Sequence, residues 1–139
     1  MEYRRFHDTL VIRMDKGEEI VEQLTAVAAR EHIALAEVSA LGAVGSFTAG
    51  VFYPGEKEYH SNDFTGDFEI VSLTGTVTEM DGKPYLHLHM SAGDREGQVW
   101  GGHLNRAVVS ATCEMVVRIL DGHVGRTFSP EIGLNLLAF

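Results

Sequence analysis

Hydrophobic residues in the first part of the chain repeat at the spacing of one helix face. Four of them recur at i, i+4, i+7 and i+8: Ile20, Leu24, Val27 and Ala28. Acidic side chains occupy the start of this segment, where the helix dipole favours them. The pattern predicts one principal helix over residues 18–31, with Asp15 and Glu18 as a capping pair at its start.

Short apolar runs and alternating positions fill the rest of the chain and predict strands. An opening strand is expected over residues 3–14. After the helix, three glycines are interpreted as breaks between short strands: Gly42, Gly45 and Gly50. Apolar and polar residues then alternate over three further segments: 68–77, 85–90 and 112–120. Asp81-Gly82 predicts a tight turn, and residues 132–139 are expected to form a last, mostly buried strand.

One helix followed by many turn-linked strands predicts an α+β fold. We expect a single compact domain over residues 1–139, in which a mainly antiparallel twisted sheet carries one principal helix packed on it. A chain of this length buries roughly two thirds of the surface that its unfolded form exposes, so it needs no disulfide to fold. The single cysteine, Cys113, lies on the apolar side of its predicted strand and is interpreted as a buried, inert thiol.

The charge of the chain bears on its partners and its location. It has 20 acidic and 11 basic residues, which gives a net charge of −9 with neutral histidines. Because nucleic acids are bound largely by lysine and arginine, direct nucleic-acid binding is not expected. No long apolar run opens the chain and no segment is apolar enough to span a bilayer, so we expect a cytoplasmic protein without membrane contact.

Two histidines in the segment 85–90 are the first candidates for chemistry. In a strand, His87 and His89 point to the same side, away from the side of Leu86 and Leu88. Two imidazoles at this spacing lie roughly 6 to 7 Å apart and can both reach one metal ion. The alternative is that they are ordinary polar residues on a solvated sheet face.

A third ligand has to come from another part of the chain. The candidate is His103, because the preceding Gly101-Gly102 allows the backbone to turn sharply or to approach a neighbour. Three neutral imidazoles with an open position suit a divalent metal, zinc foremost and also nickel or iron. The other histidines stand alone among charged or turn residues and are expected on the surface: His7, His32, His60 and His123.

Three segments follow one another in a specific order. They are residues 66–75 (GDFEIVSLTG), 84–91 (PYLHLHMS) and 97–104 (GQVWGGHL). Together they resemble the plants-and-prokaryotes-conserved (PPC) domain family. The resemblance implies a compact α+β domain that assembles as a homotrimer. It also implies a metal bound by the two-histidine strand and the Gly-Gly-His segment, which carries over to His87, His89 and His103.

Plant members of the family place an AT-hook before this domain and use the domain itself for assembly and partner recruitment. The plant recruitment segment corresponds here to a stretch that we expect to serve partners or assembly: Gly66, Phe68, Glu69, Ile70 and Ser72. The sequence departs from the plant pattern in having Asp67 in place of Arg and Val71 in place of Leu. Its 139 residues contain no Arg-Gly-Arg element, so the resemblance does not imply DNA binding by this chain.

Two functions remain open from the sequence. The first is a homotrimeric, metal-binding domain with a binding or regulatory role. The second is a metal-dependent enzyme that acts on a small anionic or carbonyl substrate at the open metal position, with Asp94 or Glu96 handling a proton. A hydrolytic triad of Ser91 and Asp94 is not expected, because no nucleophile-elbow pattern accompanies them. A cupin-like enzyme fits poorly. Cupins place a glutamate a few residues after the second histidine of the strand, and here those positions hold Ala92, Gly93 and Asp94.

Overall fold

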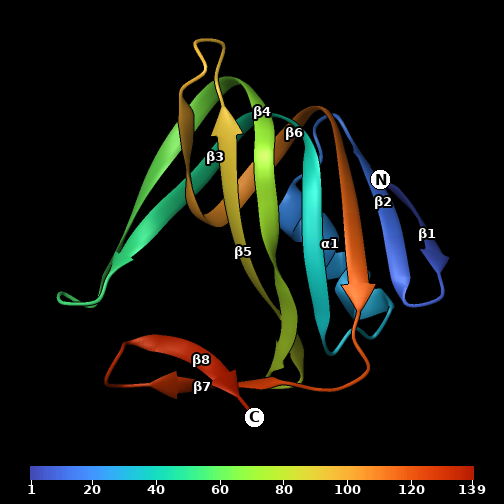
Figure 1. Ribbon diagram of the computed structural model, residues 1–139, viewed down its shortest axis with the longest axis vertical. Coiled ribbons are helices and arrows are strands. Elements are labelled where there is room, and N and C mark those ends of the chain that lie inside the picture. The colour runs from blue at the N-terminus through green and yellow to red at the C-terminus, as the bar shows by residue number, and fades with distance from the viewer.

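Eight strands and one helix make up the structure, a computed structural model that describes residues 1–139. The elements are β1 (Glu2–Phe6), β2 (Thr9–Asp15), α1 (Ile20–Arg30), β3 (Ala36–Tyr53), β4 (Glu58–Met80), β5 (Lys83–Gly93), β6 (Val99–Ile119), β7 (Gly125–Ser129) and β8 (Leu134–Ala138). Six strands form one antiparallel sheet in the order β1-β2-β6-β3-β4-β5, while β7 and β8 form a separate hairpin (Figure 1). The predicted α+β fold is confirmed, with the sheet as its dominant part.

Three long strands allow the sheet to curve around on itself. β3, β4 and β6 have 18, 23 and 21 residues, respectively, well above the usual roughly 5–6. β6 pairs with β3 along most of its length, and its first residues also pair with β5. The pairings of β3, β4, β5 and β6 therefore form a closed ring, which closes at the pair of His89 and His103.

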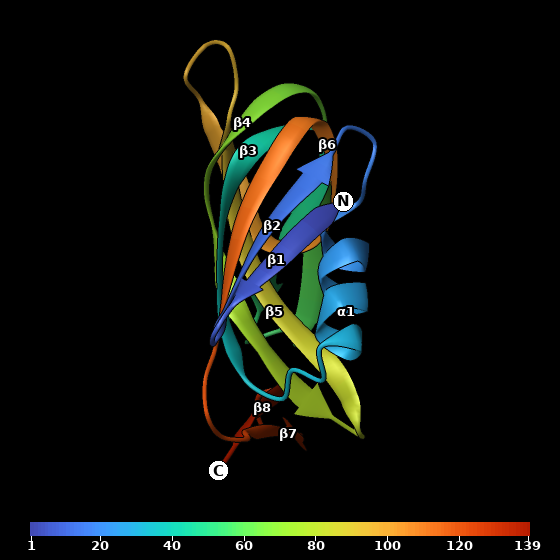
Figure 2. The same ribbon diagram turned by 90° about the vertical axis from the view of Figure 1, so that its right-hand side faces the viewer.

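The helix α1 covers one face of this curved sheet (Figure 2). Its buried side packs into a core to which all the long strands contribute large side chains: Phe47, Leu73, Val77, Leu88, Met90 and Met115. Burying this apolar side holds the helix on the sheet, as the periodicity predicted. With 11 residues, α1 is too short to cross a bilayer, and no other helix is present.

The helix is shorter than predicted at both ends. It spans Ile20–Arg30, and its cap is Glu19. The Glu19 carboxylate accepts hydrogen bonds from two backbone N–H groups of the first turn and from the N–H of Ala107 on β6. The predicted pair of Asp15 and Glu18 exists but closes the preceding turn, because the Glu18 carboxylate accepts a hydrogen bond from the Asp15 N–H at 2.7 Å.

The structure corrects two predictions about where strands end. The opening strand predicted over residues 3–14 is a hairpin, because a turn at His7 and Asp8, with φ 56° at His7, separates β1 from β2. The three glycines interpreted as breaks lie inside one strand, β3: Gly42, Gly45 and Gly50. Register shifts beside Gly42 and Gly45 mark β-bulges, which bend the strand without ending it.

The predicted alternation is confirmed over most of the remaining strands. The turn at Asp81-Gly82 is confirmed as well, with positive φ at both residues. The exception is Val71, which is 63% exposed although the pattern put it on the side of the buried Leu73. A β-bulge between Ile70 and Ser72 shifts the register there and changes the side to which the strand residues point.

The tail does not form the buried strand that its apolar sequence predicted. β8 pairs only with β7, and this hairpin lies across one end of the curved sheet (Figure 1). Several of its apolar side chains are exposed: Phe128, Ile132, Leu134, Leu136, Leu137 and Phe139. A continuous apolar run is buried on both faces only when other layers of the protein cover both faces. No such layers cover this hairpin, and its hydrogen bonds to the sheet are made by the polar side chains of Arg126 and Asn135.

Candidate metal centre

The strand β5 presents two histidines on the face of the sheet that α1 does not cover. Leu88 is buried on the helix side, so His87 and His89 on either side of it point the opposite way, where both are exposed. On the neighbouring strand β4, Thr76 pairs with His87 and Thr74 pairs with His89. This face of the sheet is therefore polar around the two imidazoles.

The strand β6 brings His103 next to this pair. His103 is paired with His89 on one side and with Gly50 of β3 on the other. Gly102 has φ 153°, and a Cβ on it would lie 2.4 Å from the Gly50 carbonyl oxygen. A Cβ on Gly101 would lie 2.2 Å from a carbonyl oxygen of β5. The Gly-Gly pair therefore permits the close approach of strands that places His103, as the sequence predicted.

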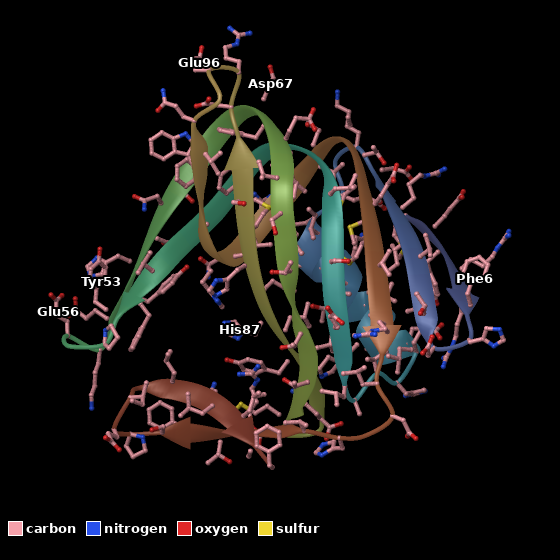
Figure 3. All side chains as sticks on the ribbon, viewed as in Figure 1. Phe6, Tyr53, Glu56, Asp67, His87 and Glu96 are labelled. Atoms are coloured by element: carbon pink, nitrogen blue, oxygen red, sulfur yellow. The ribbon has the colours of Figure 1, made fainter.

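The three imidazoles converge on one point. Their ring centroids are separated by 5.1 Å for His87 and His89, 5.3 Å for His87 and His103, and 5.6 Å for His89 and His103. Their ligand nitrogens all lie within 4.8 Å of one another. Ligand nitrogens of a tetrahedral zinc ion lie about 3.4 Å apart, so the three nitrogens are close to the separation that one shared ion requires. Figure 3 shows His87 between the curved sheet and the β7–β8 hairpin.

The surroundings of His87 and His103 favour the neutral, metal-binding form of their imidazoles. Partial burial lowers the pKa of His87, and the positive charges of His103, His89 and Arg126 act in the same direction. Burial also lowers the pKa of His103, to which His89 adds. Because a metal ion binds the neutral imidazole, these shifts keep the ligand atoms available at neutral pH.

Tyr59 of β4 supports His103 from the side opposite β5. Its hydroxyl lies 3.1 Å from the His103 carbonyl oxygen and 2.5 Å from Oδ1 of Asn105. The Tyr59 ring also meets the His103 ring edge-on, with centroids 5.8 Å apart. Burial raises the pKa of Tyr59, so its hydroxyl stays protonated as a hydrogen-bond donor.

The donor set fits an accessible metal ion better than a closed structural one. Structural zinc sites take four protein ligands, whereas sites that bind water or a substrate keep a position open. Here three imidazoles meet, and no carboxylate or thiol of the chain joins the group. Since His87 and His89 are exposed, the remaining coordination position faces solvent.

The segments that build this site also identify the family of the protein. The family model described as the Plants and Prokaryotes Conserved (PCC) domain matches residues 1–121, which include all three histidines. This chain belongs to the PCC domain family. The PCC and PPC domains are the same family, so the resemblance seen in the sequence is confirmed. The match ends at residue 121, before the β7–β8 hairpin.

Two solved structures resemble this PCC domain over nearly its whole length. A protein from Bacteroides thetaiotaomicron, provisionally named as DNA-binding, is 30% identical with a TM-score of 0.96, over 99% of this chain and 96% of that chain. The protein AF0104 from Archaeoglobus fulgidus, described as metal-containing, is 34% identical with a TM-score of 0.90, over 99% of this chain and 97% of that chain. The fold of the whole chain, including the terminal hairpin, is thus shared with these proteins.

A sequence relative is much longer than this PCC domain. The bifunctional protein GlmU of Synechococcus sp. (strain JA-2-3B'a(2-13)) is 30% identical over 113 residues, which are 76% of this chain but 16% of the relative. The similarity therefore concerns a small part of that protein.

The predicted assembly segment of the PCC domain follows β4 around its bend. Its members are Gly66, Phe68, Glu69, Ile70 and Ser72. The two apolar members face the core, whereas Gly66 and Glu69 are exposed. Ser72 lines a shallow depression of about 190 Å³ beside His89. The segment therefore reaches from an exposed bend to the edge of the histidine site.

The structure does not bring Asp94 or Glu96 to the histidines. Both lie in the β5–β6 turn, and Figure 3 shows Glu96 at the end of the molecule remote from His87. Asp94 follows His89 by five residues, which is roughly 16 Å along an extended strand. Its carboxylate accepts hydrogen bonds from two backbone N–H groups of the turn and from the Trp100 indole. It stabilises the turn and is not placed to move a proton at the histidine site.

The four remaining histidines are exposed, as predicted: His7, His32, His60 and His123. His60 belongs to a second group of potential ligands with Glu56 and Glu58, at the tip of the β3–β4 hairpin. All three side chains are exposed. Such acidic clusters on a surface commonly stay solvated, and we assign no function to this one.

Sequence reasoning missed the residues that surround the three histidines. Thr74 and Thr76 alternate with buried residues of β4. This alternation predicts that they lie on an exposed face, but it does not predict that β5 with its histidines is the neighbouring strand. Tyr59 and Arg126 reach the site from segments far away in sequence. No local pattern marks either of them, because their positions depend on the register between distant strands.

Proposed function

We propose that this PCC domain binds one divalent metal ion per chain through His87, His89 and His103, with zinc as the first choice and nickel or iron as alternatives. The observation that carries the proposal is the convergence of three imidazoles from two strands, with ligand nitrogens within 4.8 Å of one another. Neutral imidazole suits all three metals. The similar protein from Archaeoglobus fulgidus, described as metal-containing, supports the same function.

The role that fits this centre best is binding or regulation. The open, solvent-facing position accepts water or a small ligand. That same position favours the second candidate, a metal-dependent enzyme for a small anionic or carbonyl substrate. The enzyme also needs a group that moves a proton, and the two carboxylates expected for this task, Asp94 and Glu96, belong to the remote β5–β6 turn. Binding therefore remains the main proposal.

The same proposal includes assembly as a homotrimer. An isolated chain leaves an apolar patch beside the assembly segment, where Val71 and Val99 flank Gly93 and are 63% and 56% exposed. Trp100, next to Val99, is 42% exposed. Apolar groups gathered in this way commonly mark a contact with another protein chain, and contact between copies of the domain would cover them.

Direct nucleic-acid binding is not part of the proposal, although a similar protein carries a provisional DNA-binding name. The net charge is −9. Three of the arginines already pair with carboxylates of the chain: Arg5, Arg13 and Arg118. Binding to phosphates depends on a face of unpaired basic groups, and the arrangement of charges here opposes it.

A zinc titration followed by calorimetry tests the metal proposal. We expect one zinc ion per chain for the wild type and for His60→Ala, which alters the second ligand group. His87→Ala should weaken zinc binding more than about a hundredfold, since even indirect support of a ligand contributes 10- to 100-fold to affinity. Equal binding by His87→Ala and the wild type, or loss of binding in His60→Ala alone, would contradict the proposal.

A further inference from the structure

Arg126 of β7 lies on the same face of the sheet as the three histidines. Its guanidinium carbon is 4.5 Å from the centroid of the Tyr85 ring. Tyr85 precedes His87 by two positions on β5, so both side chains leave the strand on the same side. Tyr85 pairs with Thr78, and His87 pairs with Thr76. The arginine therefore occupies the next position along this face, roughly 7 Å from the pair that contains His87.

Hydrogen bonds fix the orientation of this arginine. Its Nε donates to Oγ1 of Thr78 at 2.9 Å, and its Nη1 donates to the Asn135 carbonyl oxygen at 3.0 Å. Thr78 is buried, and its hydroxyl donates to the Tyr85 carbonyl oxygen at 3.2 Å. Nη2 has no hydrogen-bond partner in the chain. Arg126 thus joins the hairpin to the sheet and keeps part of its guanidinium available.

No carboxylate of the chain neutralises this charge. Arg126 forms no salt bridge, although the chain has 20 acidic residues. All other lysines and arginines are exposed, whereas Arg126 is half-buried. An oriented, unpaired guanidinium beside a cluster of neutral ligands is suited to bind an anion.

We propose that Arg126 binds a carboxylate of a small ligand whose other end coordinates the metal, an inference that rests on the proposed three-histidine site. The free Nη2 can donate a charge-assisted hydrogen bond to a carboxylate, and the metal offers an open position for an oxygen ligand. The spacing of roughly 7 Å along the sheet requires a ligand with two separated acceptor groups. The ligand class that fits is a short dicarboxylate.

Titration of the cobalt-loaded protein with succinate and with butyrate tests this inference. Both acids have four carbons and a carboxylate for the metal, but succinate alone has a second carboxylate for Arg126. The visible absorption of cobalt reports a ligand at the open position. We expect succinate to bind the wild type about tenfold or more tightly than butyrate, since hydrogen bonds between charged groups are the strong ones.

The variant Arg126→Gln should lose this preference, with succinate binding reduced to the level of butyrate and butyrate binding unchanged. Arg126→Lys keeps the charge without the planar fork and should retain part of the preference. Arg95→Gln removes the same charge from the exposed β5–β6 turn and should bind both acids like the wild type. If Arg126→Gln does not fold, as judged by circular dichroism, the test is the preference for succinate over butyrate in the wild type and its reduction in Arg126→Lys.

Equal affinity of the wild type for the two acids would overturn the inference while leaving the metal site intact. An unchanged preference in Arg126→Gln, or an equal loss in Arg95→Gln, would also overturn it. Failure of the wild type to bind cobalt or zinc would overturn the proposed function itself and this inference with it.

Discussion

The thiol of Cys113 is fully buried on the core side of β6. Burial raises its pKa to about 11, and the charge of Glu114 acts in the same direction. A thiol in this state is protonated and unreactive at neutral pH. We therefore expect the native protein not to react with Ellman's reagent at pH 8 and to react once per chain after unfolding in urea. Rapid reaction of the native protein would contradict this account of burial.

The raised pKa of Cys113 also has a consequence for stability. The folded protein holds the thiol proton more tightly than an unfolded chain, whose thiol has a pKa near 9. This contribution is fully present below pH 9 and is lost as the pH rises toward 11. Urea unfolding at a series of pH values should show a decline in stability over this range that is smaller in Cys113→Ala.

Glu19 is the residue that ties the helix to the sheet. Replacing it by alanine removes the acceptor for two N–H groups of α1 and for the N–H of Ala107. We expect Glu19→Ala to lower the free energy of unfolding by about 2–4 kcal/mol, the sum of a lost cap and a buried donor left unpaired. Glu22→Ala, in the exposed first turn, should lower it by less than about 1 kcal/mol. Equal losses in urea unfolding at one protein concentration would contradict this role.

Single residues were predictable where a local pattern determines the side to which they point. The alternation in β5 and β6 predicted the exposed histidines and the buried Cys113, because strand geometry has a period of two. Glu19 was missed as the cap because its third hydrogen-bond donor, Ala107, lies 88 residues away in sequence. Arg126 was missed for the same reason, since its partners Thr78 and Tyr85 belong to distant strands.

Among the elements, the close pairing of β3 and β6 beside His103 depends on Gly102. A Cβ at this position would meet the Gly50 carbonyl oxygen at 2.4 Å, so the two strands would have to separate beside His103. We expect Gly102→Ala to lower the free energy of unfolding by about 3 kcal/mol or more and to weaken metal binding at the same time. Urea unfolding and a zinc titration measure the two effects.

Gly97→Ala is the matched control for this variant. Gly97 also has positive φ, 80°, but a Cβ on it would have no atom within 4 Å. The control should therefore cost only the backbone strain of about 1–2 kcal/mol and leave zinc binding unchanged. If both variants behave alike, the close approach of the strands does not explain the position of His103.

Glycines also explain why the element boundaries were only partly predictable. In a sequence, a glycine can mark a turn, a β-bulge or a close approach of two strands, and the residue alone does not say which. At Asp81-Gly82 it is a turn, whereas at Gly42 it is a bulge within β3, where a Cβ would meet the Thr112 carbonyl oxygen at 2.3 Å. Only the neighbouring strand distinguishes these cases, and its identity is a long-range property of the fold.

At the scale of the whole molecule, the α+β class and the dominance of antiparallel strands followed from element order. The closed ring of β3, β4, β5 and β6 did not, because it depends on pairings between distant segments. The exposed β7–β8 hairpin was also unexpected, since its apolar sequence resembles that of a buried strand. The exposed apolar groups that motivate the assembly proposal are a different set, around Val71 and Val99.

Sedimentation in the analytical ultracentrifuge tests this assembly. A homotrimer of 15.3 kDa chains should sediment as a species of about 46 kDa. His87→Ala should keep this mass, because the patch around Val71 and Val99 lies four strand positions from His89 and His103, roughly 13 Å along the same face. A wild-type monomer would contradict the assembly proposal, and dissociation caused by His87→Ala would make the metal site part of the subunit contact.

The most direct test of the central claim is the metal content of the untagged protein, purified without chelators and measured by elemental mass spectrometry beside His103→Ala. We predict about one divalent metal ion per wild-type chain, and its loss in a His103→Ala protein that keeps its fold. A wild-type protein without stoichiometric metal, even after incubation with zinc and washing, would contradict the claim and leave the three histidines as ordinary polar residues of an exposed sheet face.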